Sequence, residues 1–393
     1  MTNRIKIDLR YVQPNSAFVM PLYADTGELI VESRVPLSKK KLNEICGCYG
    51  NIVYFYSEYD GDDGRSSVHY ERVLAQAEAL VDEIILTQHL SDETYGQTVD
   101  VIDSLIDELE HRESQIIALV NHLNGSDDYL RYHLVNVGIL SYLFAKKSGR
   151  PTRNELRSIV LGAFLLDIGL VKMDDKLRHK EGIFSNEERL LMKRHPQLSY
   201  ELLKDINGID PVVLQIVLFH HERYNGKGYY ELPYETMPDC VKLVSICDVF
   251  DALTSERPYR PALSPQDSMK VLVNLINNQF ERRHVSLFVN SIAPQITGGQ
   301  TFYQCDDMVE LNTGELAYIC KHAIHDELDP SVRIVGRFKK GADDRPRLSF
   351  LSHPVDVNLE NDPTRSIRRF IVNLKQIESL RHILVEKKFL ELQ

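Results

Sequence analysis

The sequence predicts a mainly α protein that carries a small β segment at its N-terminal end and, at its C-terminal end, a second β segment followed by a helix. Apolar residues alternate with polar ones in the first 59 residues, and they recur at helical spacing from about Tyr70 to Val289. Short alternating runs return from Thr301 to about Phe350. At roughly 150 residues per domain, a chain of 393 residues also exceeds a single domain.

Residues 1–59 are expected to form a β-rich domain. Apolar positions alternate from Ile5 to Leu9, and apolar runs at 18–22 and 29–31 flank the turn-forming residues 25–27. The run NIVYFY at 51–56 closes this segment.

Residues 60–125 are expected to be a linker followed by a helical arm. The run Asp60-Gly61-Asp62-Asp63-Gly64 combines turn formers with charge, which is typical of a solvated linker. It superficially resembles a calcium loop, but it lacks the bidentate Glu at the required distance. Apolar residues then follow at helical spacing, namely Val73, Ala77, Leu80, Val81, Ile84, Leu105, Ile106, Leu109, Ile116, Ile117 and Val120.

Residues 126–298 are expected to form a helical domain, and residues 299–393 a β extension and a terminal helix. A turn is expected at 312–315. The tail from Thr364 is predicted to be helical, with an apolar stripe long enough to pack on the body of the protein or to pair with a second chain. The stripe contains Ile367, Phe370, Ile371, Leu374, Ile377, Leu380 and Leu384.

Charge and composition exclude several classes of protein. The 46 Lys and Arg against 57 Asp and Glu give a net charge of -11, so the overall field repels polyphosphate and argues against binding of bulk nucleic acid. A small phosphate ligand stays open, because a local pair of arginines outweighs a mildly acidic average.

We expect a soluble, cytoplasmic protein with no membrane insertion, because no run reaches the roughly 18 to 20 apolar residues of a membrane helix and the N-terminus lacks the apolar core of a signal peptide. The six cysteines are expected to be reduced. The Cys46-Gly-Cys48 pair lacks the second half of a metal site, so a metal there is disfavoured.

Several histidines and two aspartates lie in apolar surroundings, where a carboxylate needs a cation or a strong hydrogen-bond partner. Each side chain taken singly is explained by a neighbouring hydrogen-bond partner, whereas the set together predicts a shared site. Imidazole nitrogen and carboxylate oxygen suit Fe, Mn or Zn, and a bridged pair of such ions clamps the two oxygens in phosphoester hydrolysis. The set is His133, Asp167, His195, His220, His221 and Asp248.

The run His220-His221-Glu222-Arg223-Tyr224-Asn225-Gly226-Lys227-Gly228-Tyr229-Tyr230 resembles the HHE-x-x-(D/N)-G-x-G-Y-P signature of the HD-GYP family of cyclic-dinucleotide phosphodiesterases. Residues 166–170 stand where that family has H-D-I-G-K, and 180–185 resemble its K-P-G-x-L-T loop. His195-Pro196, the run 248–254 and the run 257–260 match further family segments. The match covers about residues 133–262, and residues 309–319 resemble the family's C-terminal extension.

The resemblance implies an HD-superfamily helical bundle that holds Fe or Mn ions and acts on cyclic di-GMP or a related dinucleotide. Carried over by position, it makes Asp167 the bridging carboxylate and catalytic residue, and it gives Asp251, Arg257, Arg260 and Tyr229 to the ligand. The planar guanidinium supports this for the arginines, although surface pairing with Glu256 or Asp267 is the alternative. The implied metal ligands are His133, Asp167, His195, His220, His221 and Asp248.

Two departures from the family pattern concern the chemistry itself. Leu166 replaces the name-giving histidine and cannot coordinate a metal, so one of the two metal sites is weakened or lost. Leu170 replaces the lysine expected to neutralise the scissile phosphate. Lys172 is close in sequence but is expected on the wrong helical face to replace it.

Two further departures concern the number of ions and the signature loop. Tyr129, four residues before His133, replaces the glutamate of three-metal members and argues against a third ion. Tyr230 replaces the proline of the signature. The ligands expected around the second metal are retained, so the sequence predicts one or two ions; these ligands are Asp167, His195, His220 and His221.

The leading hypothesis is a degenerate HD-GYP protein that binds metal and recognises a cyclic dinucleotide as a sensor or effector, with weak or no hydrolysis. An active phosphodiesterase that tolerates both leucines is the second hypothesis, and a pure interaction scaffold is the third. The arm and the C-terminal stripe favour a homodimer, and the N-terminal domain is a candidate surface for a protein partner. The sequence leaves open the choice between cyclic di-GMP and cyclic GMP-AMP and the identity of the metal.

Overall fold

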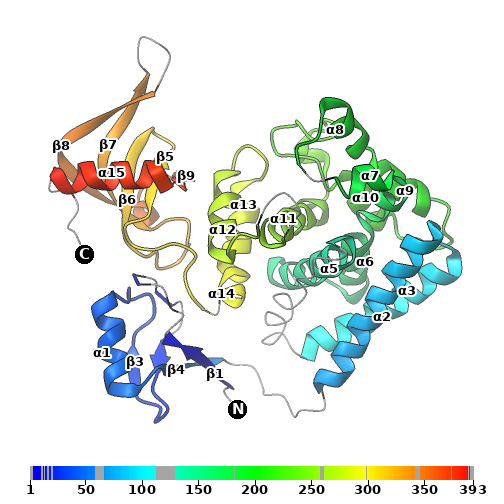
Figure 1. Ribbon diagram of the computed structural model, residues 1–393, viewed down its shortest axis with the longest axis horizontal. Helices are drawn as coiled ribbons and strands as arrows, with labels where there is room; N and C mark the ends of the chain where they lie inside the picture. The colour runs from blue at the N-terminus through cyan, green and yellow to red at the C-terminus, as the bar shows by residue number, and fades with distance from the viewer. Residues whose placement is uncertain are drawn as a thin grey trace. The chain divides into compact units, whose positions relative to one another are not determined.

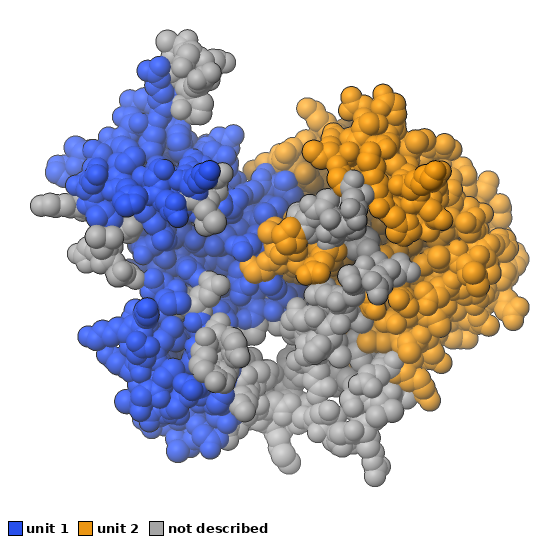
Figure 2. Space-filling model, viewed as in Figure 1, with its two compact units in different colours: residues 1–58, 265–276, 288–393 blue, residues 59–264, 277–287 orange. Residues whose placement is uncertain are grey.

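The chain forms two compact units that are interleaved along the sequence (Figure 2). Unit 1 comprises residues 1–58, 265–276 and 288–393, and unit 2 comprises residues 59–264 and 277–287. The computed structural model describes residues 3–9, 12, 14–15, 17–18, 21–57, 66–111, 129–149, 151–180, 182–256, 261–297, 299–340, 346–372, 374–387 and 389.

The mainly α class with two β segments is confirmed (Figure 1). The domain limits at 59, 125 and 298 stay predictions. The two units are divided differently: residues 265–276 and 288–298 of the predicted helical domain belong to unit 1. Among the described residues, no helix combines the length and the apolar character needed to span a membrane.

Unit 2 begins with a helical hairpin, which is the described part of the predicted arm. Helices α2 (Ser66–Thr87) and α3 (Asp92–His111) pack on each other, and the connection between them starts at Gln88, which has a φ of 52°. The hairpin also packs on the rest of unit 2, with α2 against α5 and α3 against α6. Residues 112–128, which the arm prediction also covers, lie outside the described residues.

The core of unit 2 is built from α5 (Tyr129–Ser148), α6 (Arg153–Leu165), α10 (Pro211–Phe219) and α11 (Asp239–Thr254). Helix α6 packs on α5 and α10, and α11 packs on α5. Helix α6 starts at a capping box between Thr152 and Glu155 and is apolar around most of its circumference, as expected for a helix that other helices surround.

Shorter elements connect these helices. They are η2 (Ile168–Lys172), α7 (Asp175–Arg178), α8 (Asn186–Met192), α9 (His195–Leu203) and η3 (Tyr234–Thr236). Helix α9 packs against both η2 and α10. The loops predicted around 149–152, 178–185 and 207–211 fall between helices of unit 2, and the loop predicted around 223–238 contains the short helix η3.

The N-terminal part of unit 1 is a four-stranded sheet with one helix. Its strand order is β1-β4-β2-β3, with β1 (Asn3–Asp8), β2 (Leu22–Tyr23), β3 (Leu29–Val31) and β4 (Ile52–Ser57). Helix α1 (Lys39–Tyr49) was not predicted; Ser38 caps its first turn by accepting a hydrogen bond from Lys41 N, at 3.2 Å.

The C-terminal part of unit 1 is a five-stranded antiparallel sheet in the order β8-β7-β6-β5-β9. Its strands β5 (Met308–Leu311), β6 (Glu315–Lys321), β7 (Ser331–Lys340) and β8 (Pro346–Asn358) follow one another along the chain, and the 3-10 turn η4 (Leu359–Asn361) follows β8. Unit 1 also contains α12 (Pro265–Asn274) and α14 (Ala293–Ile296), and α13 (Arg282–Ser291) carries the chain into it from unit 2.

The prediction of a helix from Thr364 onward is wrong for its first part. Residues Ile367–Phe370 form strand β9, which pairs with β5, and only Leu374–Glu386 form a helix, α15. The register shifts between Glu310 and Leu311, so the side chains of Arg368 and Arg369 are both exposed and both bind Glu310. Because of this irregularity the buried apolar residues of β9, Ile367 and Phe370, are three positions apart, a spacing that is also typical of a helix.

Helix α15 lies across the C-terminal sheet (Figure 1) and covers its apolar face. Leu380 and Leu384 are buried there against Leu316, Tyr318 and other sheet residues. Of the two roles left open for the C-terminal stripe, the structure therefore shows packing on the body of the protein.

Within unit 1, the N-terminal and C-terminal parts are fastened by an ion pair. Arg34 Nη1 donates to the Ala323 carbonyl oxygen at 2.9 Å and also to the carboxylate of Glu327, which is 3% exposed. Next to this pair the imidazole of His322 stacks on Tyr303, with ring centroids 5.0 Å apart. Neither ring nitrogen of His322 has a hydrogen-bond partner among the described residues.

The stability of unit 1 is predicted to fall as the pH drops from about 6.5 to 4. Burial and the charge of Arg34 lower the pKa of His322 to about 4, so the unfolded chain takes up a proton in this range while the folded chain does not. The loss is on the order of 3 kcal/mol. His322→Phe keeps the stacking and is expected to flatten this pH dependence in urea titrations, whereas the same change at exposed His353 leaves it intact. An unchanged slope in His322→Phe would contradict the prediction.

Candidate metal centre

Asp167 is held at the junction between α6 and η2. Helix α6 ends at Leu165, Leu166 follows in helical geometry, and Asp167 has φ −107° and ψ 8° at the start of η2. The buried Ser199 of α9 fixes this junction, because its hydroxyl donates to Leu166 O at 2.8 Å and accepts from Gly169 N at 2.7 Å. The carboxylate of Asp167 is thereby tied to the helix that carries His195.

Two histidines present the same ring nitrogen to Asp167. His195 begins α9 and its Nδ1 donates to Met192 O at 2.7 Å, while His220 follows the last residue of α10 and its Nδ1 donates to Val217 O at 2.9 Å. Their Nε2 atoms lie 3.0 and 3.4 Å from Asp167 Oδ1. Both rings are buried.

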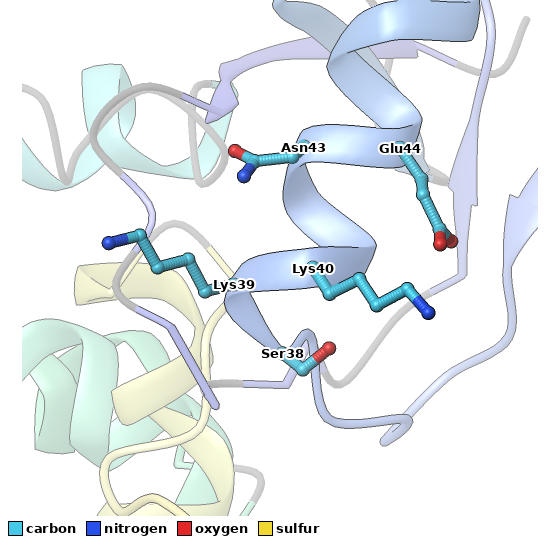
Figure 3. Close-up of a pocket in the computed structure, with 5 residues that line it drawn as sticks. All are labelled: Ser38, Lys39, Lys40, Asn43 and Glu44. Atoms are coloured by element: carbon cyan, nitrogen blue, oxygen red, sulfur yellow. The ribbon is translucent and has the colours of Figure 1, made fainter. Parts of the chain in front are cut away.

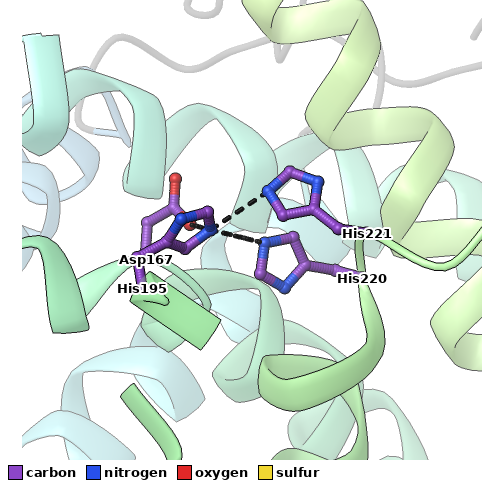
Figure 4. A group of neighbouring side chains, drawn as sticks. All are labelled: Asp167, His195, His220 and His221. Carbon is purple, nitrogen blue, oxygen red and sulfur yellow. Dashed lines mark hydrogen bonds and ion pairs between the residues drawn. The ribbon is translucent and has the colours of Figure 1, made fainter. Parts of the chain in front are cut away.

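Asp167, His195, His220 and His221 form one cluster in which the potential ligand atoms all lie within 4.8 Å of one another (Figure 4). His221 Nε2 lies 3.0 Å from His195 Nε2, which in turn lies 3.3 Å from His220 Nε2. The sequence predicted these four residues as the group around one metal, and the structure brings them together.

The cluster fits a cation. Asp167 Oδ1 is buried and, among the described residues, accepts no hydrogen bond of good geometry. Burial alone would raise the pKa of Asp167, but the charge of His195 and the ring nitrogens of three histidines hold that pKa well below its usual range. The pKa of His195 is raised despite its burial, because Asp167 faces it. The site thus favours positive charge, as a buried carboxylate beside imidazole lone pairs does in metal centres.

A second group of side chains lies on the other oxygen of the same carboxylate. His133 Nε2 is 3.5 Å from Asp167 Oδ2 and 3.3 Å from Asp248 Oδ1. Here Leu166 is fully buried and offers no ligand atom. The two aspartates and His133 are therefore three potential ligands without the fourth that the family pattern supplies.

Asp251 lies behind His133. Its Oδ2 is 2.7 Å from His133 Nδ1 and accepts a bond from Ser255 Oγ at 3.3 Å, and its side chain is 1% exposed. A carboxylate in this place orients the imidazole and fixes which ring nitrogen carries the proton. The ligand-facing role expected for Asp251 gains no support from this position.

The signature loop after α10 is built around Glu222. Its carboxylate accepts bonds from Tyr230 N at 2.7 Å and Leu232 N at 2.8 Å, and it is 2% exposed. Gly228 packs so closely on Glu222 that a Cβ at this position would overlap it. The loop is also tied to residues 277–281 through backbone bonds from Tyr224 N and Asn225 N.

A basic pocket of about 290 Å³ opens beside the cluster. Tyr229 forms one wall, with its ring 4.4 Å from that of His221 and with Lys193 Nζ 5.3 Å above it; burial raises the pKa of Tyr229 to about 12. Three cations and several amides make this surface suitable for an anion. The lining residues are Lys193, His221, Arg223, Asn225, Lys227, Tyr229, Asn278 and Gln279.

The structure does not cover every predicted site residue. Arg257 and Arg260 lie outside the described residues, as does the side chain of Tyr129. Leu170 is buried and Lys172 is exposed at the end of η2. The sequence did not predict Lys193 and Arg223 as site residues, although Arg223 lies inside the quoted signature. The available signal was position, because each of these basic residues is two positions from a predicted metal ligand, His195 or His221.

A second hollow, of about 720 Å³, lies on α1 in unit 1 (Figure 3). Its lining residues are Ser38, Lys39, Lys40, Asn43 and Glu44, and Lys39 and Lys40 point to opposite sides of the helix. Among the described residues, no second group of potential metal ligands lies at this hollow. Cys46 and Cys48 of the same helix are free thiols.

Residues 108–283 match the protein family described as the HD domain. Together with the histidine and aspartate motifs, this match to an HD domain supports the resemblance to the HD-GYP family that the sequence indicates. A HDG"Y"P protein from Bdellovibrio bacteriovorus has a similar fold, with a TM-score of 0.50 and 19% identity over 72% of this chain and 98% of that one.

Two curated relatives are similar to part of the chain. A cyclic di-GMP phosphodiesterase of Pseudomonas aeruginosa is 28% identical over 250 residues, which are 62% of this chain and 58% of the relative. The cyclic di-GMP phosphodiesterase response regulator RpfG of Xanthomonas campestris is 32% identical over 191 residues, which are 48% of this chain and 50% of the relative. The chain thus spans about half the length of these relatives.

Gly169→Ala is predicted to destabilise the protein by about 3 kcal/mol or more. The added Cβ would collide with the backbone of His195 and Ser199, and neither backbone segment is free to move without displacing a site histidine. Gly138→Ala is the control, because a Cβ there meets its nearest neighbour, Val160, at 3.9 Å. Urea unfolding of both variants checks the expectation; equal stability of the two would argue against close packing of η2 on α9.

Proposed function

We propose that this protein binds a divalent metal ion and a cyclic dinucleotide, and that it acts as a sensor or effector with weak or no hydrolysis. Asp167, His195 and His220 would hold the ion, with His221 at the fourth corner of the cluster. The observation that supports this proposal is the buried Asp167 carboxylate, whose Oδ1 faces two imidazole nitrogens at 3.0 and 3.4 Å beside the apolar Leu166.

Recognition of phosphate is supported by the basic pocket. Lys193, Arg223 and Lys227 line it, and His221 belongs to both the pocket and the cluster. A divalent cation, when bound, would neutralise a phosphodiester oxygen, and the pocket cations would hold the rest of the anion. The relatives named cyclic di-GMP phosphodiesterases make cyclic di-GMP the first ligand to test, with cyclic GMP-AMP as the alternative.

Weak hydrolysis is supported by what surrounds Asp167. Hydrolysis by a metal pair needs a second ion, and Leu166 removes a ligand from the group of His133, Asp167 and Asp248. Leu170 removes a positive charge from the place where charge develops on the phosphate. Losing one such stabilising group typically costs ~2.7 to 4 kcal/mol in the transition state, or about a hundredfold or more in rate.

A working phosphodiesterase is the second candidate, and one observation favours it. His133, Asp167 and Asp248 still converge, with 3.5 and 3.3 Å between their facing atoms, and Asp251 still orients His133. Three protein ligands are a sufficient number for a catalytic metal that keeps an open position. Fe and Mn remain the proposed metals, since this donor set accepts either.

The test is a turnover assay with cyclic di-GMP and Mn²⁺ or Fe²⁺, in which the wild-type protein is compared with Leu166→His. We expect about one Mn²⁺ per wild-type chain and at least a hundredfold slower hydrolysis than in Leu166→His, because the variant regains the missing ligand. Asp167→Asn, which loses the shared carboxylate charge, is the control and is expected to lose the ion. Equal rates in wild type and Leu166→His would refute the sensor role and support the active enzyme.

The homodimer also remains a proposal, now supported only by the arm, because the α15 stripe is covered by the sheet of its own chain. Light scattering at working concentrations is expected to give twice the chain mass of 45.2 kDa. A mass equal to that of a single chain would count against it. The N-terminal domain stays the proposed surface for a protein partner.

A further inference from the structure

The basic pocket is lined by amides as well as by cations. The amides belong to Asn225, Asn278 and Gln279. At about 290 Å³ the pocket is at the lower end of the range for small-molecule sites, so it has room for part of a cyclic dinucleotide, such as one phosphate and one base. The cations suit the phosphate. Amides, which both donate and accept hydrogen bonds, suit the edge of a base.

Asn278 lies in the turn 277–280, between α12 and α13, and the backbone of this turn is fixed. Asn277, with a φ of 61°, donates from its N–H to Phe280 O at 2.9 Å. The signature loop holds the same turn, because Asn225 N donates to Asn278 O at 3.1 Å and the adjacent residues form a second backbone bond at 2.9 Å. The side chain of Asn278 is therefore carried by a backbone that is held from two sides.

The direction of the Asn278 amide follows from its contact with Asn225. Asn225 Oδ1 accepts a hydrogen bond from Lys227 N at 2.9 Å, and a backbone N–H only donates. The other amide atom of Asn225, Nδ2, then faces Asn278 and donates to its Oδ1 at 2.5 Å. Asn278 is left with Nδ2, a donor, for a ligand. Among the described residues, this atom has no hydrogen-bond partner.

A donor at this position discriminates between purine bases. Guanine carries an acceptor at O6, whereas adenine carries a donor amino group at the corresponding position, N6. The N–H of an amide bonds to O6 of guanine, but it meets a second donor in adenine. Because a polar group that loses its partner in a binding site lowers affinity, the Nδ2 donor of Asn278 favours guanine.

We propose that Asn278 is a specificity-determining residue that donates a hydrogen bond from Nδ2 to O6 of a guanine base, and that Asn225 is the positioning residue that orients this amide. The role of Asn278 rests on the proposed function and deepens it, because it assigns a guanine to the pocket while the cations hold the neighbouring phosphate. Cyclic di-GMP and cyclic GMP-AMP both contain a guanine, whereas cyclic di-AMP does not.

The first test compares the affinities for cyclic di-GMP and cyclic di-AMP, measured on the full chain at saturating Mn²⁺. We expect the wild type to prefer cyclic di-GMP about tenfold or more, and Asn278→Ala to lose most of this preference, because one hydrogen bond is removed. Lys227→Ala is the control and is expected to weaken both ligands by the same factor, since the phosphates are common to both. An unchanged preference in Asn278→Ala would overturn the proposal.

The second test reverses the amide without removing it. The carboxylate of Asn225→Asp cannot donate to Asn278 Oδ1, so it accepts from Nδ2 and Asn278 turns its Oδ1 toward the ligand. We expect the preference for cyclic di-GMP over cyclic di-AMP to fall about tenfold. The added negative charge weakens both ligands equally, so the ratio of affinities is the readout. A merely structural role of Asn225 would leave this ratio at its wild-type value and would contradict the positioning role.

The third test identifies the atom of the base. Cyclic di-IMP keeps O6 of guanine and lacks the 2-amino group, so Asn278→Ala is expected to weaken cyclic di-IMP and cyclic di-GMP by the same factor. A loss confined to cyclic di-GMP would rule out O6 as the acceptor. If Asn278→Ala weakens all dinucleotides equally, cyclic di-AMP included, the amide contacts phosphate and only the role of Asn278 fails. If the wild type binds none of them, the proposed function fails as well.

Discussion

The site depends on the buried carboxylate of Asp167, which lies between two histidines on one side and a third histidine on the other. Asp167 directs one oxygen to His195 and His220 and the other to His133. It reaches this position because α6 ends two residues before it and Ser199 ties the junction to α9. A carboxylate stripped of water at this place requires a positive partner. The arrangement of the surrounding helices therefore serves to bring imidazole nitrogens from α5, α9 and the end of α10 to one point.

The two oxygens of that carboxylate face different numbers of potential metal ligands, and the proposed function follows from this difference. One side keeps three imidazoles and opens into a basic pocket, whereas the other side pairs His133 and Asp248 with an apolar Leu166. Binding an anion through one ion and a set of cations requires only the first side. Cleaving a phosphodiester draws on both, because attacking and leaving oxygens need separate stabilisation. Under the proposed function, the leucine at position 166 would therefore uncouple binding from cleavage.

The sequence predicted the class of fold and the clustered residues because both leave strong patterns. Isolated polar residues in apolar runs, such as Asp167, indicate a buried site, and apolar spacing indicates helices. Strand β9 was predicted as helix because a register shift at Glu310 interrupts the alternation of its apolar residues. Helix α1 was not predicted, although Ser38 and the buried Leu42 and Ile45 have the pattern of a capped helix. The contact between His221 Nδ1 and Arg223 Nη2, at 3.3 Å, could not be predicted, because no spacing in the sequence encodes which ring nitrogen faces a neighbour.

The interleaving of the two units has a consequence for the timing of synthesis. Arg34 and its partner Glu327 are 293 residues apart in the chain, and Ala17 and Thr301 bridge a similar span. At 5–20 residues per second, the ribosome needs about 15–60 s to make the later partner after the earlier one has emerged. All of the continuous segment 59–264 is synthesised within that interval. The cluster of Asp167, His195, His220 and His221 can therefore assemble before the strands that complete unit 1 have been synthesised.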